Sequence, residues 1–149
     1  MTINAPDLTQ CPPRSPRVRL GGYCILPRLL DKGRATLAGK NGEFCYNCPL
    51  DQRFFEFAGI DAKALLKELK KNKGDGEVLK WIQKQSKTKP TLLEILNWSA
   101  YQDQRGATDL DSREFFQKYH AKLAPHRTDI GTWFDVLDLD DHVTFGGKA

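Results

Sequence analysis

The sequence predicts an all-α fold: a single compact domain of about six to seven short helices, preceded by an extended arm rich in proline and arginine. Apolar residues recur three and four positions apart, which is the spacing of one face of a helix. Glycine and proline interrupt this pattern at short intervals, so the predicted helices and loops are short. No alternation of strands with helices and no internal repeat is visible, and 149 residues suit one domain.

Residues 1–20 are predicted to form the extended arm, and residues 21–149 the helical domain. The arm contains Cys11-Pro12-Pro13 and Ser15-Pro16, and proline disfavours helix both at its own position and at the preceding one. Two interpretations of the arm remain open: it is a strap laid over the core, or it binds an acidic partner. The second interpretation rests on three closely spaced arginines: Arg14, Arg17 and Arg19.

The first helix is predicted over about Tyr23–Ala38. Its apolar stripe contains leucines and Gly33, where the missing side chain would let another backbone approach closely. Pro27 falls in the first turn, where its absent N–H is tolerated. Charged residues occupy the opposite side of this helix: Arg28, Asp31, Lys32 and Arg34.

Three further helices are expected after a turn at Asn41-Gly42. Pro49 suits the first position of the second helix, and Gly59 ends that helix. Asp61 can cap the third helix through its side-chain oxygen. A break at Gly74-Asp75-Gly76 precedes the fourth helix, which is marked by Val78, Trp81 and Ile82.

The remaining residues predict three more helices and a tail. The fifth helix starts after Lys87-Thr88-Lys89-Pro90. Asp111 is predicted to cap the sixth helix, with Glu114 three residues on as in a capping box. The last helix is expected to begin near Thr128 and to end early, because a run of aspartates is unfavourable at a helix C-terminus. Residues 137–149 are therefore predicted to form an irregular tail.

The net charge of +4 hides an asymmetry along the chain. Residues 14–89 contain 17 lysines and arginines against 8 aspartates and glutamates, whereas residues 90–149 contain 6 against 10. The first part could therefore attract anions. No apolar run is long enough to span a membrane, and the first residues lack the pattern of a secretory signal. We expect a cytoplasmic protein whose cysteines are thiols or metal ligands, with no membrane as a partner.

The candidate ligand-binding residues gather on the charged side of the first helix. Arg28, Asp31 and Arg34 are one turn apart, so one acid could bridge two guanidinium groups. The alternative is a solvated helix face whose ion pairs contribute little. With the arm and the start of the second helix, this face predicts a site for an acidic protein or an anionic small ligand, formed by Arg17, Arg28, Asp31, Lys32, Arg34 and Asp51.

Cys45 and Cys48 form a C-x-x-C pair near the start of the second helix. The pair could bind zinc if further ligands converge, could carry redox chemistry, or could pack under a turn. We predict no metal and no cofactor. If a metal were bound, Cys45 and Cys48 would be the candidate ligands. A cluster of aspartates beside His142 could bind a divalent cation or form a charged, solvated tail.

The nine lysines from Lys63 to Lys89 offer a further alternative, contact with a nucleic-acid backbone. No aromatic residues are interleaved with them on the polar face to stack on bases, so a solvated helix surface is the competing interpretation.

Short motifs between Pro16 and Ile60 carry a family resemblance: Pro16-Arg17, Leu20-Gly21-Gly22, Pro27-Arg28, Asp31-Lys32, Arg34-Ala35, Gly39, Gly42-Glu43, Cys48-Pro49-Leu50-Asp51 and Gly59-Ile60. In order and spacing they resemble a family of bacterial proteins described as domain of unknown function 5069. The resemblance extends through residues 74–82 and the helix that contains Trp98, and so covers most of the chain. It implies no particular activity, cofactor or partner.

The leading hypothesis is a small cytoplasmic binding module that recognises an acidic protein or an anionic ligand. A rival hypothesis is an enzyme, or a metal or redox protein, that uses Cys45 and Cys48 with the charged face of the first helix. Nucleic-acid binding through the lysine series is the third hypothesis. The sequence leaves open whether the protein catalyses a reaction.

Overall fold

Seven α-helices follow the arm in the computed structural model, which describes residues 2–149. They are α1 (Leu26–Leu37), α2 (Pro49–Ala58), α3 (Ala62–Leu69), α4 (Asp75–Gln85), α5 (Leu92–Gln104), α6 (Leu110–Leu123) and α7 (Trp133–Thr144). The described residues form no sheet, only an isolated bridge between Leu20 and Tyr23. The predicted all-α fold is therefore confirmed. Within residues 2–149, no helix is long and apolar enough to cross a membrane.

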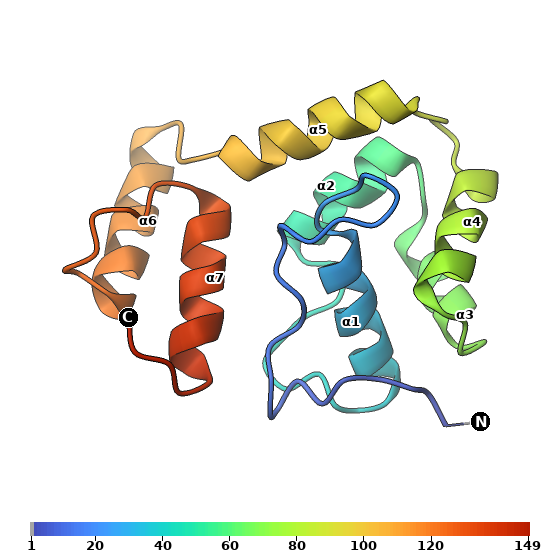
Figure 1. Cartoon of the computed structure of the whole chain (residues 1–149), viewed down its shortest axis with the longest axis horizontal. Helices are drawn as coiled ribbons and strands as arrows, with labels where there is room; N and C mark the ends of the chain where they lie inside the picture. The colour runs from blue at the N-terminus through green and yellow to red at the C-terminus, as the bar shows by residue number, and fades with distance from the viewer. Residues whose placement is uncertain (1) are drawn as a thin grey trace.

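The helices form two groups that α5 connects (Figure 1). In one group α1 packs on α2 and α3, and α3 packs on α4; in the other, α6 packs on α7. Helix α5 runs along the top of both groups in this view and packs on α7. The arm passes between α1 and α7, so it lies where the two groups face each other.

The main hydrophobic core lies among α1 to α4 and also takes in Ile95 of α5 and Phe134 of α7. Phe54 at its centre is fully buried, and its ring lies edge-on to that of Tyr23, with 5.2 Å between centroids. The expected role of Gly33 is wrong in one respect, because side chains and not a backbone fill the space beside it. A Cβ atom there would lie 2.7 Å from Leu69 Cδ1.

The predicted limits of α2 and the predicted cap of α3 are confirmed. Helix α2 begins at Pro49 and ends before Gly59, whose φ of 64° is a left-handed conformation that favours glycine. Asp61 Oδ2 accepts a hydrogen bond from the N–H of Ala64 at 2.8 Å, which caps α3.

Four helices begin at positions other than those predicted. One of them is α7, which begins at Trp133 and not near Thr128, because the Thr132 side chain caps it. Helix α1 starts at Leu26, not near Tyr23, because Ile25 has a positive φ of 70° that interrupts the helical path. Gly74 precedes α4 as its N-cap, so Asp75 and Gly76 form the first turn instead of a break. Asp109, not Asp111, caps α6, because its carboxylate accepts from the Ser112 N–H at 2.8 Å.

The predicted irregular tail at residues 137–149 is wrong over most of its length, because α7 continues to Thr144. The predicted unfavourable effect of aspartates at the C-terminus of a helix is offset by cations from elsewhere in the chain. Arg17 of the arm contacts Asp135 and Asp138, and Arg28 of α1 contacts Asp141. Helix α7 therefore tolerates its negative charge because it lies against a basic surface.

The arm lies on the body as an ordered strap. Its Leu8 side chain is buried, and the Leu8 N–H donates to the Lys40 carbonyl at 2.8 Å. Ion pairs hold the arginines of the arm in place. Arg19, for example, lies 2.6 Å from Asp103 of α5. The arm thus ties together helices that are far apart in sequence.

Candidate functional site

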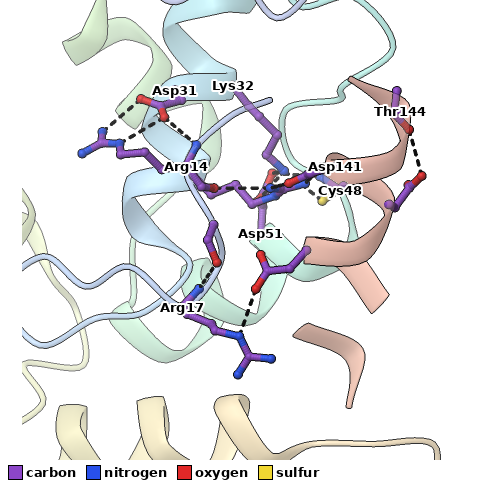
Figure 2. A network of polar contacts seen from close by, with 12 residues as sticks. Arg14, Arg17, Asp31, Lys32, Cys48, Asp51, Asp141 and Thr144 are labelled. Carbon is purple, nitrogen blue, oxygen red and sulfur yellow. Dashed lines mark hydrogen bonds and ion pairs between the residues drawn. The ribbon is translucent and has the colours of Figure 1, made fainter. Parts of the chain in front are cut away.

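Lys32 lies at the centre of the predicted ligand-binding face. Its ammonium donates to both carboxylate oxygens of Asp51, at 2.9 and 2.8 Å, and contacts Cys48 Sγ at 3.2 Å. Its side chain is 4% exposed and that of Asp51 is 0% exposed, so this is a buried ion pair. Asp51 Oδ2 also accepts from the N–H groups of Asn47 and Cys48, at 3.0 and 3.3 Å. The pair therefore fixes the start of α2 against α1 (Figure 2).

Asp31 and Arg34 pair with residues outside α1, not with each other or with Arg28. Asp31 accepts from the Arg14 backbone N–H at 2.9 Å and from the Arg14 guanidinium at 3.0 Å. Asp75 accepts from Arg14 and from Arg34, both at 2.7 Å. The predicted bridge within α1 is thus replaced by a network that joins the arm, α1 and the start of α4.

Arg28 and Arg17 connect the first helix group to α7. Arg28 lies 2.7 Å from Asp141, with side chains 5% and 11% exposed, and its guanidinium lies over the Phe44 ring. Arg17 contacts Asp138 at 3.0 Å and also contacts Asp135. Burial raises the pKa of Asp141, and the nearby Arg28 offsets this only in part.

The predicted face is therefore mostly an internal interface. Arg28, Asp31 and Lys32 are buried, so the alternative of a solvated helix face is wrong for these three residues. All six predicted ligand-binding residues take part in ion pairs within the chain. Binding of an external acid by these residues stays a prediction. Such an acid would have to compete with the carboxylates that already pair with the basic residues of this face. A cavity of about 520 Å³ lies beside Asp31 and Arg34. Its charged side chains also have ion-pair partners within the chain, so an external anion would meet the same competition there.

The network around Asp75 predicts a loss of stability in acid. Burial alone would raise the pKa of Asp75, but hydrogen bonds from Arg14 and Arg34 outweigh burial and lower it. The folded state then holds this proton more weakly than the unfolded state, so the stabilisation is present above a pH of about 4 and is lost below it. Equilibrium unfolding in urea from pH 7 to pH 2.5 should show this fall, and Asp75→Asn should make it shallower. An unchanged slope in the variant would exclude Asp75 as a contributor.

The remaining candidates from the sequence do not converge. Cys11 and Cys45 are exposed and Cys24 is buried in the core, where burial raises its pKa to about 11. Within residues 2–149, no three side chains of histidine, cysteine, aspartate or glutamate gather in a way that could hold a metal ion. Cys48 contacts Lys32, as described above. The aspartates of α7 contact Arg17, Arg28 and Tyr119.

A second cavity, of about 230 Å³, lies between the two helix groups and was not anticipated from the sequence. It is formed where α2, the end of α5, and the starts of α6 and α7 meet. Arg105 follows α5 and is fixed there, because its carbonyl accepts from the Trp133 N–H at 3.0 Å and its guanidinium lies 5.9 Å from the Trp133 ring centre. The lining residues are Arg53, Tyr101, Arg105, Gly106, Thr108, Asp109, Ser112 and Trp133.

The two arginines of this cavity differ from most of the others. The chain has nine arginines, and six of them pair with carboxylates: Arg14, Arg17, Arg19, Arg28, Arg34 and Arg127. Arg53 and Arg105 make no ion pair with any carboxylate of residues 2–149. Asp109 lines the same cavity, but its Oδ1 accepts from the Ser112 N–H at the start of α6.

The electrostatics of the cavity favour an anion. Burial lowers the pKa of Arg105, and the positive charge of Arg53 lowers it further. The Nε atom of Arg105 is buried without a hydrogen-bond partner in residues 2–149. The N-terminus of α6, a helix of 14 residues, borders the cavity and adds partial positive charge. The cavity thus contains the positive charges of Arg53 and Arg105 and the negative charge of Asp109.

No sequence pattern could have identified this pair, because Arg53 lies on α2 and Arg105 follows α5, with no periodic relation between them. The useful signal is indirect: Arg105 comes just before Gly106, at the end of a helix, where a side chain can turn into a neighbouring cavity.

Comparison with known proteins gives a family and no function. No curated protein matches the chain at a significant level. A family model matches residues 10–143, and this range includes Arg53, Arg105 and the whole predicted face. The chain belongs to the family described as domain of unknown function (DUF5069).

Proposed function

We propose that the protein is a binding module for an anionic group, and that Arg53 and Arg105 hold the anion at the N-terminus of α6. One observation carries the proposal: both arginines line one cavity, and neither is neutralised by a carboxylate of residues 2–149. Like charges held together in a partly buried place cost stability, and an anion between them would remove that cost.

The contrast with the α1 face supports this location. There every guanidinium already has a carboxylate, so an incoming anion must displace an internal partner. In the cavity the anion gains charge-assisted hydrogen bonds without breaking an ion pair. An anionic ligand, as the sequence predicts, would therefore bind in the Arg53/Arg105 cavity and not on the α1 face.

The test is titration of the protein with acetate and with inorganic phosphate at low salt, followed by NMR of the arginine Nε–H and backbone signals. The signals of Arg53, Arg105 and Ser112 should shift together. Arg53→Ala and Arg105→Ala should each weaken binding about tenfold or more, since a hydrogen bond to a charged group contributes about 1.5–3 kcal/mol.

Arg113→Ala is the matched control, because Arg113 is also unpaired within residues 2–149 but does not line the cavity. It should leave both titrations unchanged, and thermal unfolding without anion should show that all three variants are folded. Equal binding by wild type and both cavity variants would contradict the proposal.

A further inference from the structure

The outer sides of α3 and α4 are basic. Leu65 and Leu69 of α3 lie in the main hydrophobic core. Val78 and Ile82 of α4 lie in the same core. The side of each helix opposite these residues therefore points away from the core. Five exposed lysines occupy these outer sides, and we call them the basic face: Lys63, Lys67, Lys70, Lys80 and Lys84.

The two helices of the basic face are neighbours. Helix α3 packs on α4, and both lie at one edge of the molecule, on the side of α1 away from α7 (Figure 1). Lys63 and Lys67 are four positions apart, which places them on one side of α3. Lys80 and Lys84 have the same spacing on α4. The basic face therefore extends over two adjacent helices.

The carboxylates near these lysines are already engaged. Helices α3 and α4 and the turn between them contain three acidic residues: Glu68, Asp75 and Glu77. Glu68 is buried and pairs with Lys71 and Lys73, and Asp75 pairs with arginines of the arm and of α1. Glu77 accepts from the backbone N–H before α4. The five lysines of the basic face make no ion pair with any carboxylate of residues 2–149.

A solvated helix surface usually mixes both signs of charge. Helix α6 is an example, since its exposed residues include Asp111, Arg113, Glu114 and Lys118. The basic face carries one sign only, although like charges four positions apart on a helix are destabilising. A solvated surface gives no reason to keep this repulsion, whereas an anionic partner would remove it.

The surroundings of the lysines distinguish among anionic partners. Within residues 62–85, no large apolar side chain is exposed. Protein interfaces depend on aromatic residues and arginine, and lysine is depleted in them. Helices that bind a membrane surface insert apolar side chains among the lipids. A basic face without apolar side chains therefore favours neither an acidic protein nor a membrane.

A nucleic-acid duplex matches the basic face better. Binding that is independent of base sequence depends on contacts of lysine and arginine with phosphates. Single strands also stack their bases on aromatic side chains, but Trp81, the one aromatic residue of α3 and α4, is half-buried against the core. From Lys63 to Lys70 a helix rises about 10 Å, and a duplex presents about six phosphates over that length. Each lysine can thus contact a different phosphate.

We propose that the basic face binds the phosphate backbone of double-stranded nucleic acid without reading its base sequence. Phosphate contacts position a protein on a duplex and carry no sequence information. The dissociation constant should be roughly 10⁻⁴–10⁻⁶ M, as for other non-specific binding. This inference does not rest on the proposed function, because none of the five lysines lines the Arg53/Arg105 cavity.

The experiment is fluorescence anisotropy of a labelled DNA duplex of mixed sequence, titrated with the protein at salt concentrations from about 50 mM to about 200 mM. Five phosphate contacts predict a slope of about −4.5 for the logarithm of the affinity against that of the salt concentration, a loss of a few hundredfold over this range. The double variant Lys80→Ala with Lys84→Ala should make the slope shallower by about two. It should leave the acetate titration unchanged.

The double variant Lys118→Ala with Lys122→Ala is the matched control. It removes the same charge from two exposed lysines of α6, which also have no ion-pair partner within residues 2–149, and it should leave the slope unchanged. Circular dichroism should show both double variants folded. A single strand, a polyglutamate peptide and vesicles containing phosphatidylserine should each bind more weakly than the duplex. Equal slopes in the two double variants, binding insensitive to salt, or equally tight binding of one of these three competitors would overturn the proposal.

Discussion

Replacing Asp51 with alanine should lower the free energy of unfolding by about 3–5 kcal/mol, the usual cost of removing one partner from a buried ion pair. The change leaves the Lys32 ammonium buried with only Cys48 Sγ near it. It also removes the acceptor for the N–H groups of Asn47 and Cys48 at the start of α2. Urea unfolding followed by circular dichroism measures the effect.

The double variant Lys32→Met with Asp51→Leu is the informative control. Because it removes both charges and fills the space with apolar groups, it should recover much of the stability lost in Asp51→Ala. Asp51→Asn should lie between wild type and Asp51→Ala, since the amide oxygen can still accept from the backbone. A loss below about 1 kcal/mol in Asp51→Ala would mean that water reaches Lys32, in conflict with its burial.

Arg28→Ala should produce the second large effect, also about 3–5 kcal/mol at neutral pH. Arg28 pairs with Asp141 at 2.7 Å and covers the Phe44 ring, so its loss removes a link between α1 and α7. The pH dependence gives a specific signature. Burial already raises the pKa of Asp141 in the intact protein. Without Arg28 this pKa should rise further, so the folded variant gains a proton, and hence stability, as the pH falls.

The loss caused by Arg28→Ala should therefore be largest near pH 7 and clearly smaller near pH 5. A double-mutant cycle with Asp141→Ala, measured at both values, tests this directly: the coupling energy should decrease as Asp141 takes up a proton. A coupling energy that is the same at both pH values, or close to zero at pH 7, would contradict the assigned pair.

These two effects bear on any test of the α1 face as a binding surface. Charge reversal at Arg17 or Arg28 would place a carboxylate beside those of α7. If such a variant no longer bound an external partner, displacement of α7 alone would explain the result. Replacing Arg53 or Arg105 breaks no ion pair within residues 2–149, so a loss of binding in those variants is not explained by a displaced helix.

The sequence by itself determined the helices and several of their ends, because these depend on residues close together in the chain. The spacing of Leu26, Leu29 and Leu30, the proline at the start of α2 and the glycine after it act within one or two helical turns. The predicted cap of α6 is wrong, because Asp109 and Asp111 both suit a cap and local preference does not distinguish between them.

Only the tertiary structure decided which charges are neutralised, because electrostatic partners are chosen by proximity in space. Arg14 meets Asp75 across 61 positions, and Arg28 meets Asp141 across 113. The same contacts explain why α7 continues through its aspartates, which local rules predicted to be unfavourable. A basic residue in the sequence is equally basic whether it is paired or free. Only packing shows that the arginines of α1 already have carboxylates while Arg53 and Arg105 face a cavity without an ion-pair partner in residues 2–149.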